Sequence, residues 1–321
     1  MFSQDELSGM VERYLEGMAI PTQPAGLYRP IRYTLEEGGK RLRPMLLVAG
    51  CNVFADKVGR ALPCAAAVEV FHNFTLLHDD IMDNAALRRG KESVFKKWGA
   101  NAALLSGDAM MIFAYHLLEK APRKYLPDIL SEFNAMALEV CEGQQLDMEF
   151  EGRAEVSTGE YIRMIELKTA ALVARPLGIG ALVGGAGEKE CRALYEFGRN
   201  LGIAYQLQDD LLDTYGEQET FGKSIGGDII EGKKTYLVVS AVAAGYGREL
   251  MPVLRDGALT PQHKIELVKM LFDKAGATAA ARKGIAHYTA LALETLAGLD
   301  APEERKVVLR DVSVGLLNRS K

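Results

Sequence analysis

Two copies of one acidic pattern, Asp-Asp-x-x-Asp, limit what this chain can fold into more than any other feature. They comprise Asp79, Asp80 and Asp83 in the first copy and Asp209, Asp210 and Asp213 in the second. Each copy ends a mostly apolar segment whose apolar residues recur at helical spacing, which predicts two helices that end in carboxylates. Residues four apart share a helix face, where two carboxylates repel each other. A divalent cation bridging them would remove that repulsion.

A solvated acidic helix end is the alternative interpretation of either copy. It fits poorly because acidic residues near a helix C-terminus oppose the helix dipole, and because the pattern of Asp79 recurs 130 positions later at Asp209. We therefore expect the two clusters to face each other across a cavity and to hold Mg²⁺. Proteins bind this ion through one or two carboxylates, and substrate phosphates complete its octahedron.

The composition favours a soluble protein, and the periodicity predicts helices along the chain. Of 321 residues 48% are hydrophobic, and the net charge of −5 argues against a nucleic-acid-binding surface. The helical periodicity is not interrupted by an alternating strand pattern, a linker or a low-complexity tract, so we expect a single domain over residues 1–321. Because no stretch approaches eighteen uninterrupted apolar residues and the first ten residues lack a signal-peptide core, we expect a cytoplasmic protein without membrane insertion.

Glycine and capping residues set the expected helix limits. Helices are expected over residues 3–18, 26–37, 125–152 and 158–168, with four or five more after residue 235. Ser157 or Thr158 is the expected N-cap of the helix over 158–168, and Gly216 is expected to stop the helix that carries the second acidic copy. Residues 91–101 are expected to form a connection.

The four cysteines indicate a reducing compartment. They are Cys51, Cys64, Cys141 and Cys191, which lie far apart in the sequence. No pair has the spacing of a zinc site or a redox motif, so we expect buried free thiols.

Basic residues gather where an anion could bind. Lys40, Arg41 and Arg43 stand at a helix start, where positive charge opposes the helix dipole unless a phosphate docks there. Further bases are Arg88, Arg89, Lys168, Lys223 and Lys233. Surface solubility and a structural ion-pair network are the alternatives. Because the acids end apolar helices and most bases lie at helix starts or in loops, the arrangement favours a diphosphate held by Mg²⁺ on one side and by Arg and Lys on the other.

Six motifs in this order resemble the trans-isoprenyl diphosphate synthases, also called polyprenyl synthetases, over nearly the whole chain. They are GGKRLRP at 38–44, LLHDDIMD with RRG at 76–90, GQQLD at 143–147, KTA at 168–170, YQLQDDLLD at 205–213 and FGKSIGGDIIEGKKTYL at 221–237. The resemblance is to the short-chain type, such as geranylgeranyl or farnesyl diphosphate synthase. It implies an all-α bundle of antiparallel helices around a deep central cavity, usually a homodimer, that condenses isopentenyl diphosphate head to tail with an allylic diphosphate.

The resemblance also implies roles for single residues. Asp79 and Asp83 would hold two Mg²⁺ ions, and Asp209 would help to hold a third, with Asp80, Asp210 and Asp213 nearby. The isopentenyl diphosphate site would comprise Lys40, Arg43, His72 and Arg89. The allylic diphosphate would be bound by Arg88, Lys168, Lys223 and Lys233. Thr169 and Gln206 would lie beside the reacting carbon, where their oxygens stabilise a carbocation. The glycine-rich segment 221–234 is expected to be a mobile loop that closes over substrate.

The tail of the substrate would occupy an apolar pocket along the helix that carries Asp79. Phe71, Phe74 and Thr75 lie one to two turns before Asp79 and would set the pocket's depth. An aromatic residue at position 74 is typical of short-chain producers in the resembling family, which leaves C15 and C20 products open. A lone His72 among apolar residues has a core interpretation too, and Phe74 could simply pack against a neighbouring helix.

Two other functions compete with prenyl transfer. A class I terpene cyclase shares the first aspartate motif but usually has a different second motif and lacks the basic GGKRLRP loop. A non-catalytic subunit that modulates an active synthase typically loses aspartates, and both sets are intact here. No dedicated base is evident, so the released diphosphate is the expected proton acceptor.

Overall fold

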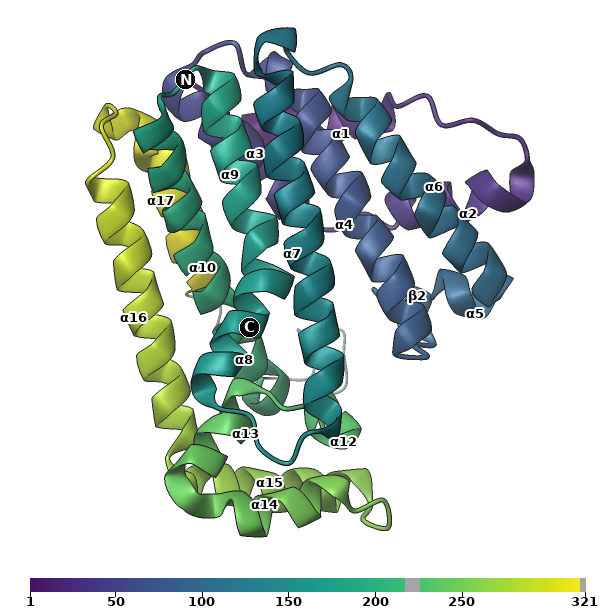
Figure 1. Cartoon of the computed structure of the whole chain (residues 1–321), viewed down its shortest axis with the longest axis vertical. Helices are drawn as coiled ribbons and strands as arrows, with labels where there is room; N and C mark the ends of the chain where they lie inside the picture. Colours follow the sequence, from purple (N-terminus) through teal and green to yellow (C-terminus); the bar gives the residue numbers. More distant parts are fainter. Residues whose placement is uncertain (217–225, 318–321) are drawn as a thin grey trace. The chain divides into compact units, whose positions relative to one another are not determined.

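The computed structural model describes residues 1–216 and 226–317, and Figure 1 labels its elements. Within these residues every regular element is helical except one short hairpin, β1 (Leu87–Arg88) paired antiparallel with β2 (Lys91–Glu92). The expected all-α fold is confirmed. The expectation of no strands was wrong at this hairpin, because two-residue strands are too short to show an alternating pattern.

Contacts between residues divide the chain into two compact units. The first comprises Met1–Asn134, Arg175–Tyr195 and Leu299–Leu309, and the second comprises Ala135–Ala174, Glu196–Gly298 and Arg310–Lys321. Each unit is therefore assembled from three separate stretches. The single domain expected from the sequence stays a prediction.

The first unit consists mainly of helices from the N-terminal part of the chain. It contains α1 (Gln4–Glu16), α2 (Ala25–Glu36), α3 (Leu42–Phe54), the 3₁₀ turn η1 (Val58–Ala61), α4 (Leu62–Met82), the hairpin, α5 (Val94–Trp98), α6 (Ala100–Leu118) and the turn η2 (Arg123–Tyr125). In this unit α4 packs along α6. Small residues bring α3 close to another helix: a Cβ at Gly50 would lie 2.8 Å from the Leu177 carbonyl oxygen.

Four helices contribute residues to both units. They are α7 (Leu126–Gly152), α9 (Ala171–Gly184), α10 (Glu188–Tyr215) and α17 (Glu303–Leu317). The expected helix over 125–152 is confirmed by α7, and the expected stop at Gly216 follows the end of α10 directly.

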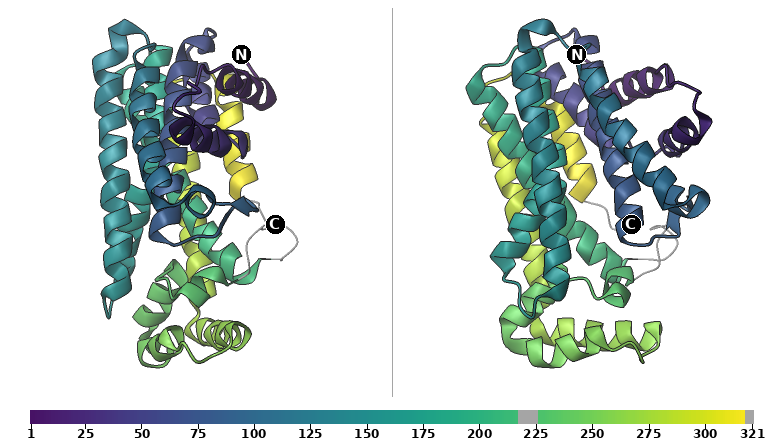
Figure 2. Two further views of the ribbon diagram at one scale, coloured as in Figure 1. Left: turned by 90° about the vertical axis from the view of Figure 1, so that its right-hand side faces the viewer. Right: turned by 45° about the vertical axis from the view of Figure 1, so that its right-hand side comes forward.

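The second unit contains the remaining elements. They are α8 (Thr158–Ile165), the π-turn η3 (Glu166–Ala170), α12 (Gly227–Glu231), α13 (Tyr236–Ala241), the π-turn η4 (Val242–Tyr246), α14 (Gly247–Arg255), α15 (Pro261–Ala275) and α16 (Ala277–Ala297). Figure 1 and both views of Figure 2 show α14 and α15 side by side, and residues of both belong to one core cluster that also includes Leu211 and Ile229. A second cluster packs Tyr161, Met164 and Leu207 under η3.

Local signals account for the start of α8 but not for its end. Ser157 is the N-cap and forms a reciprocal capping box with Glu160, as expected. The expected end at Lys168 was wrong, because the chain continues through η3 directly into α9. Residues 91–101 were expected to be a connection, and they instead contain β2 and the short helix α5.

Two helical stretches pass a length and composition test for crossing a membrane, Thr158–Gly184 and Tyr236–Arg255. In the first, 78% of the most apolar window is buried inside the protein, as in the core helix of a soluble protein. The second is 33% buried and is interrupted by Gly245 at φ 95°. The absence of membrane insertion stays a prediction.

All four cysteines are free, as expected. Cys51 and Cys64 are buried, and burial raises the pKa of the Cys64 thiol to about 12. Burial was wrongly expected for Cys141, which is exposed, and Cys191 is half-buried.

Candidate active site

The first aspartate motif closes α4. Asp83 is the C-cap, and its N–H donates to the Asp79 carbonyl oxygen at 2.8 Å, so the two side chains stand one helical turn apart as predicted. Asp79 is half-buried and Asp83 is exposed. Carboxylates in this position are accessible to a cation and its ligands.

Asp80, the middle residue of this motif, is only 4% exposed and forms an ion pair with Arg88. The Arg88 Nε donates to Asp80 Oδ1 at 2.8 Å, and Nη2 donates to the same oxygen. Burial lowers the pKa of Arg88, but the hydrogen bond and charge of Asp80 outweigh it and the net shift is upward. The structural ion pairing that the sequence left open as an alternative is thus present between Asp80 and Arg88. Metal binding by Asp80 and diphosphate binding by Arg88 stay predictions.

The RRG motif forms the tight turn between β1 and β2. Arg89 at φ 50° and Gly90 at φ 78° occupy its two central positions, the geometry of a type I′ hairpin. Arg88 thereby points to Asp80, whereas Arg89 Nη1 donates to the Gly38 carbonyl oxygen. A Cβ at Gly39 would lie 3.1 Å from Arg89 Cζ. The structure therefore brings the GGKRLRP and RRG motifs together.

Arg43 and His72 meet beside this turn, with 3.1 Å between Arg43 Nη1 and His72 Nε2. Because arginine only donates, Nε2 is the acceptor and the proton lies on Nδ1. No described residue hydrogen-bonds that buried Nδ1. Burial lowers the pKa of His72 well below 6.5, and the charges of Arg43, Arg89, Arg88 and Arg41 lower it further. So much positive charge around a neutral imidazole suits an anion.

Arg41 has a different role from the other bases of its loop. It caps α3 at φ 44° and is 7% exposed, with Nη1 2.5 Å from the Glu69 carboxylate and Nη2 donating to the Leu35 carbonyl oxygen. Asn73 Nδ2 also donates to Glu69, at 2.9 Å. Arg41 thus fixes the loop to α4, while Lys40 beside it is exposed.

The three residues expected to set pocket depth lie on α4, one to two turns before Asp79. Phe71 is fully buried, and its ring centroid lies 5.4 Å from Phe74 and 5.5 Å from Phe133. Phe74 is half-buried, with its ring 4.8 Å from His78. The Thr75 hydroxyl donates to the His72 carbonyl oxygen at 2.8 Å. Phe71 therefore belongs to the core, and its effect on product length stays a prediction.

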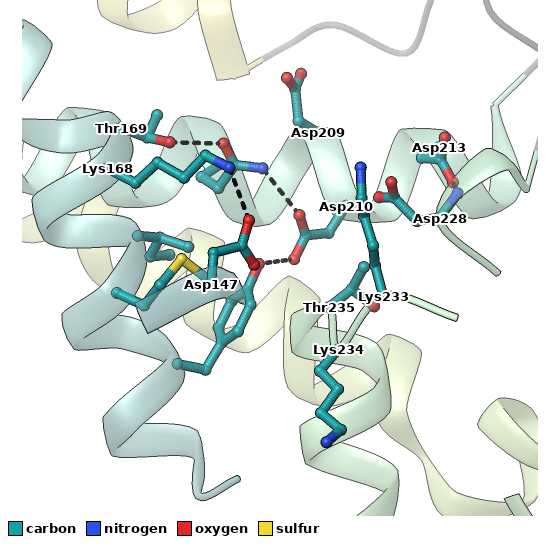
Figure 3. Close-up of a pocket in the computed structure, with 14 residues that line it drawn as sticks. Asp147, Lys168, Thr169, Asp209, Asp210, Asp213, Asp228, Lys233, Lys234 and Thr235 are labelled. Carbon is teal, nitrogen blue, oxygen red and sulfur yellow. Dashed lines mark hydrogen bonds and ion pairs between the residues drawn. The ribbon is translucent and has the colours of Figure 1, made fainter. Parts of the chain in front are cut away.

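The second aspartate motif borders a cavity of about 240 Å³ in the second unit (Figure 3). Residues predicted from the sequence line it: Lys168, Thr169, Gln206, Asp209, Asp210, Asp213 and Lys233. Residues without a predicted role also line it, among them Tyr161, Asp228, Lys234 and Thr235. A larger cavity of about 690 Å³ adjoins α1 and α2, and among the described residues Arg41 is the one residue of the predicted basic cluster in its lining.

A chain of hydrogen bonds crosses this cavity. Thr169 Oγ1 donates to Gln206 Oε1 at 3.0 Å, and Gln206 Nε2 donates to Asp210 Oδ1 at 3.0 Å. Asp210 Oδ2 accepts from the Tyr161 hydroxyl and, at 2.9 Å, from the Tyr236 N–H. Burial raises the pKa of Asp210 to about 7 against the lowering effect of these bonds. Metal binding by Asp210 stays a prediction.

Lys168 and Thr169 lie on η3, which is held between two glycines. A Cβ at Gly143 would lie 2.3 Å from the Lys168 backbone nitrogen, and one at Gly202 would lie 2.6 Å from Ala170 Cα. Lys168 Nζ forms an ion pair with Asp147 at 2.7 Å. In the GQQLD motif, Gly143 thus lets α7 approach the Lys168 backbone closely, and the Asp147 carboxylate orients the Lys168 side chain.

The side chains of Asp213 and Lys234 form hydrogen bonds with backbone groups. Asp213 is 8% exposed, and its Oδ2 accepts from the Asp228 N–H at 3.1 Å. Lys234 donates to the Phe150 and Arg153 carbonyl oxygens at the end of α7. Lys233 forms a 2.8 Å ion pair with Glu231. Lys223 and the rest of 217–225 lie outside the described residues.

Both motifs offer carboxylates of the kind that Mg²⁺ prefers. Among the described residues no group of three His, Cys, Asp or Glu side chains converges on one point. Pairs one turn apart, such as Asp79 with Asp83, suit an ion that takes one or two carboxylates and completes its shell with phosphate and water. The ion, its number and the facing of the two motifs stay predictions.

Comparisons with known proteins agree with these features. A model of the family described as polyprenyl synthetase matches residues 24–271. Geranylgeranyl diphosphate synthase of Methanosarcina mazei is 42% identical over 243 residues, 74% of each chain, and geranylgeranyl pyrophosphate synthase of Geoglobus acetivorans is 35% identical over 302 residues, 94% of this chain and 93% of the relative. A crystal structure of geranylgeranyl pyrophosphate synthase matches with a TM-score of 0.96 at 44% identity, over 100% of both chains.

Proposed function

The chain belongs to the polyprenyl synthetase family and is a short-chain prenyltransferase, and we propose that it joins isopentenyl diphosphate head to tail to an allylic diphosphate. The observation that carries this proposal is the cavity where Lys168, Thr169, Gln206 and the second aspartate motif meet. It combines cationic, carboxylate and neutral oxygen groups, which an ionising diphosphate needs. Neither a terpene cyclase nor a modulating subunit is favoured by the relatives.

In the proposed reaction Lys168 and Lys233 would bind the allylic diphosphate in the cavity of the second unit, and Arg88 stays a predicted ligand. Bound Mg²⁺ would neutralise the charge of the leaving diphosphate. The oxygens of Thr169 and Gln206 lie 3.0 Å apart and would stabilise positive charge on the allylic carbon as the C–O bond breaks. The isopentenyl double bond then forms the new C–C bond, and the released diphosphate takes the proton lost from the adjacent carbon.

The isopentenyl diphosphate site is proposed around Arg43, His72, Arg89 and Lys40. Its support is the positive charge that lowers the pKa of His72 after the larger effect of burial. A diphosphate would offset the mutual repulsion of these arginines and give the Nδ1–H of His72 an acceptor.

Phe74 is proposed to end the tail pocket and to limit the product to C15 or C20. Its ring is fixed between Phe71 and His78, so a longer tail would have to displace packed side chains. Phe74→Ala should lengthen the product by one or more isoprene units, and Phe71→Ala should add to this effect. Mass spectrometry of the products measures both, and an unchanged distribution in the double variant would place the limit elsewhere.

A homodimer in the cytoplasm is proposed for the assembled enzyme. On α6, Leu104, Leu105 and Ile112 are 45%, 60% and 70% exposed, more apolar surface than a helix usually presents to water. Four free cysteines suit a reducing compartment. Sedimentation velocity should give a dimer for the wild type and a monomer for Leu105→Glu with Ile112→Glu; a wild-type monomer would refute the dimer.

The reaction is tested by incubating the purified protein with Mg²⁺, isopentenyl diphosphate and one allylic primer: dimethylallyl, geranyl or farnesyl diphosphate. The expected products after dephosphorylation are C15 or C20 all-trans alcohols. Cyclised hydrocarbons would instead identify a terpene cyclase, and absence of turnover would identify a modulating subunit. Either outcome would contradict the proposal.

A further inference from the structure

Four side chains from three elements form one continuous hydrogen-bond chain in the cavity of Figure 3. Tyr161 comes from α8, Thr169 from η3, and Gln206 and Asp210 from α10. Gln206 and Asp210 are four residues apart on the same helix face, so their contact follows from helix geometry. Tyr161 joins the chain from 49 positions away in the sequence.

The direction of each bond in this chain is set by Asp210. The carboxylate accepts three hydrogen bonds, from the Tyr161 hydroxyl, the Gln206 amide and the Tyr236 N–H. Gln206 Nε2 donates to Asp210 Oδ1 at 3.0 Å, so the NH₂ of Gln206 faces the carboxylate. The amide oxygen of Gln206 then points away from Asp210.

The direction of the Thr169–Gln206 hydrogen bond follows from the orientation of the Gln206 amide. Gln206 Oε1 is an acceptor, so the Thr169 hydroxyl donates its proton to it across 3.0 Å. Thr169 and Gln206 both line the cavity, and each of the two oxygens keeps a lone pair that these hydrogen bonds do not use. Two dipoles are thereby held by one chain of hydrogen bonds at the wall of the cavity.

Tyr161 fixes the carboxylate that starts this sequence. Its side chain is 3% exposed and packs in the cluster with Met164, Ile203 and Leu207, so the hydroxyl has little freedom. Tyr161 and the backbone of Tyr236 both donate to Asp210 Oδ2, which leaves Oδ1 for Gln206. Loss of the Tyr161 hydroxyl would allow the carboxylate to rotate and Gln206 to turn over.

We infer that Tyr161 is a positioning residue that acts through Asp210 to orient the oxygens of Gln206 and Thr169 toward the allylic carbon. The inference rests on the proposed function. Tyr161 should therefore affect the bond-breaking step and not substrate affinity. The diphosphate is proposed to bind to Lys168 and Lys233 and, through Mg²⁺, to Asp209. Oriented dipoles of this kind act where charge develops in the transition state.

A double-mutant cycle between Tyr161→Phe and Gln206→Leu tests the inference. Tyr161→Phe keeps the ring and its packing. We expect kcat to fall about tenfold, less than the roughly 100- to 1,000-fold loss for a group that contacts the reacting atoms, because Tyr161 acts through Asp210. The KM for the allylic diphosphate should change less than about twofold. In the Gln206→Leu background the same Tyr161→Phe change should alter kcat by less than about twofold, because the group through which Tyr161 acts is gone.

Tyr288→Phe is the matched control. Tyr288 packs on the same cluster, and no described residue hydrogen-bonds its hydroxyl, so its kcat should equal that of the wild type. The inference is overturned if Tyr161→Phe lowers kcat by the same factor in both backgrounds, leaves kcat unchanged, or acts mainly on KM. Failure of the wild-type protein to condense the two diphosphates would instead refute the proposed function. The wild-type assay alone detects this failure, so the two outcomes are distinguishable.

Discussion

The two aspartate motifs share one spacing but differ in what surrounds their middle residue. Asp80 is paired with a guanidinium, whereas Asp210 is surrounded by the neutral donors Tyr161, Gln206 and the Tyr236 N–H. The third residues differ too, since Asp83 is exposed and Asp213 is buried against the start of α12. Helix geometry therefore sets the spacing of the first and third carboxylates in each motif. Tertiary contacts determine the hydrogen-bond and charge partners of the middle carboxylate.

This difference predicts which substitutions act alike and which do not. Asp79 and Asp209, the first residues of the two motifs, should behave alike because both are proposed to hold metal ions. Substitutions of the middle residues should differ in effect, because Asp80 neutralises Arg88 whereas Asp210 orients the Gln206 amide. Four predictions follow this contrast from the largest effect to the smallest.

Asp79→Ala and Asp209→Ala should each lower turnover by several orders of magnitude, because metal-assisted ionisation needs carboxylates from both motifs. Single-turnover assays measure the loss, and circular dichroism should show unchanged helix content. If one motif were only structural, its variant would keep near-normal turnover, and the parallel between the motifs would fail.

Gly143→Ala should lower kcat about 100-fold, the usual scale for a displacement of about 1 Å at a reacting group. The added Cβ would lie 2.3 Å from the Lys168 backbone nitrogen, so η3 must move. In the first unit, Gly107→Ala meets the tip of the His78 ring at 2.2 Å, which a side-chain rotation can relieve, and its effect should be smaller. Gly159→Ala, with open space around the new Cβ, is the control. Equal activity of Gly143→Ala and Gly159→Ala would contradict this account of the turn.

Asp80→Asn should lower the free energy of unfolding by about 2 kcal/mol, because it leaves a largely buried guanidinium without its charge partner. Asp210→Asn should change it by less than about 1 kcal/mol at pH 8, because it removes a buried charge as well as an acceptor. Urea denaturation in EDTA measures both values. A larger loss for Asp210→Asn than for Asp80→Asn would contradict the contrast.

The pH dependence of stability should also differ between the units. The Asp210 pKa is raised from 3.8 to about 7, so the folded protein binds a proton that the unfolded chain has released, and its contribution to stability falls as pH rises through this range. The His72 pKa lies below 6.5, so its contribution falls as pH drops below 6.5, by at most about 1.4 kcal/mol per pH unit. Because the two contributions oppose each other between pH 5 and 6.5, His72→Gln should make stability fall more steeply with rising pH in that range in urea titrations. An unchanged pH dependence would show that His72 does not contribute.

Features set by nearby residues could be predicted from the sequence. The helix ends at Asp83 and Gly216, the Ser157 cap and the all-α class follow from periodicity and capping residues within a few positions. Arg43, His72 and Arg89, which the motifs place in one group, also lie near one another in the structure, and their role in binding stays a prediction.

The features that were missed depend on contacts between distant positions. The π-turn at 166–170 depends on close approach to Gly143 and Gly202, and the role of Tyr161 depends on a bond to Asp210. No local pattern reveals either. Arg41 was grouped with the other loop bases, because its burial against Glu69 on another helix is invisible in the sequence.

We propose that Asp79 and Asp209 each help to hold metal ions for an allylic diphosphate. Electron paramagnetic resonance of Mn²⁺, added with an unreactive allylic thiolodiphosphate, measures how many ions each aspartate helps to bind. The account predicts three bound ions per chain in the presence of the analogue, with fewer in either Asp79→Ala or Asp209→Ala. Equally tight binding of the analogue in EDTA, or an unchanged ion count in both variants, would contradict it.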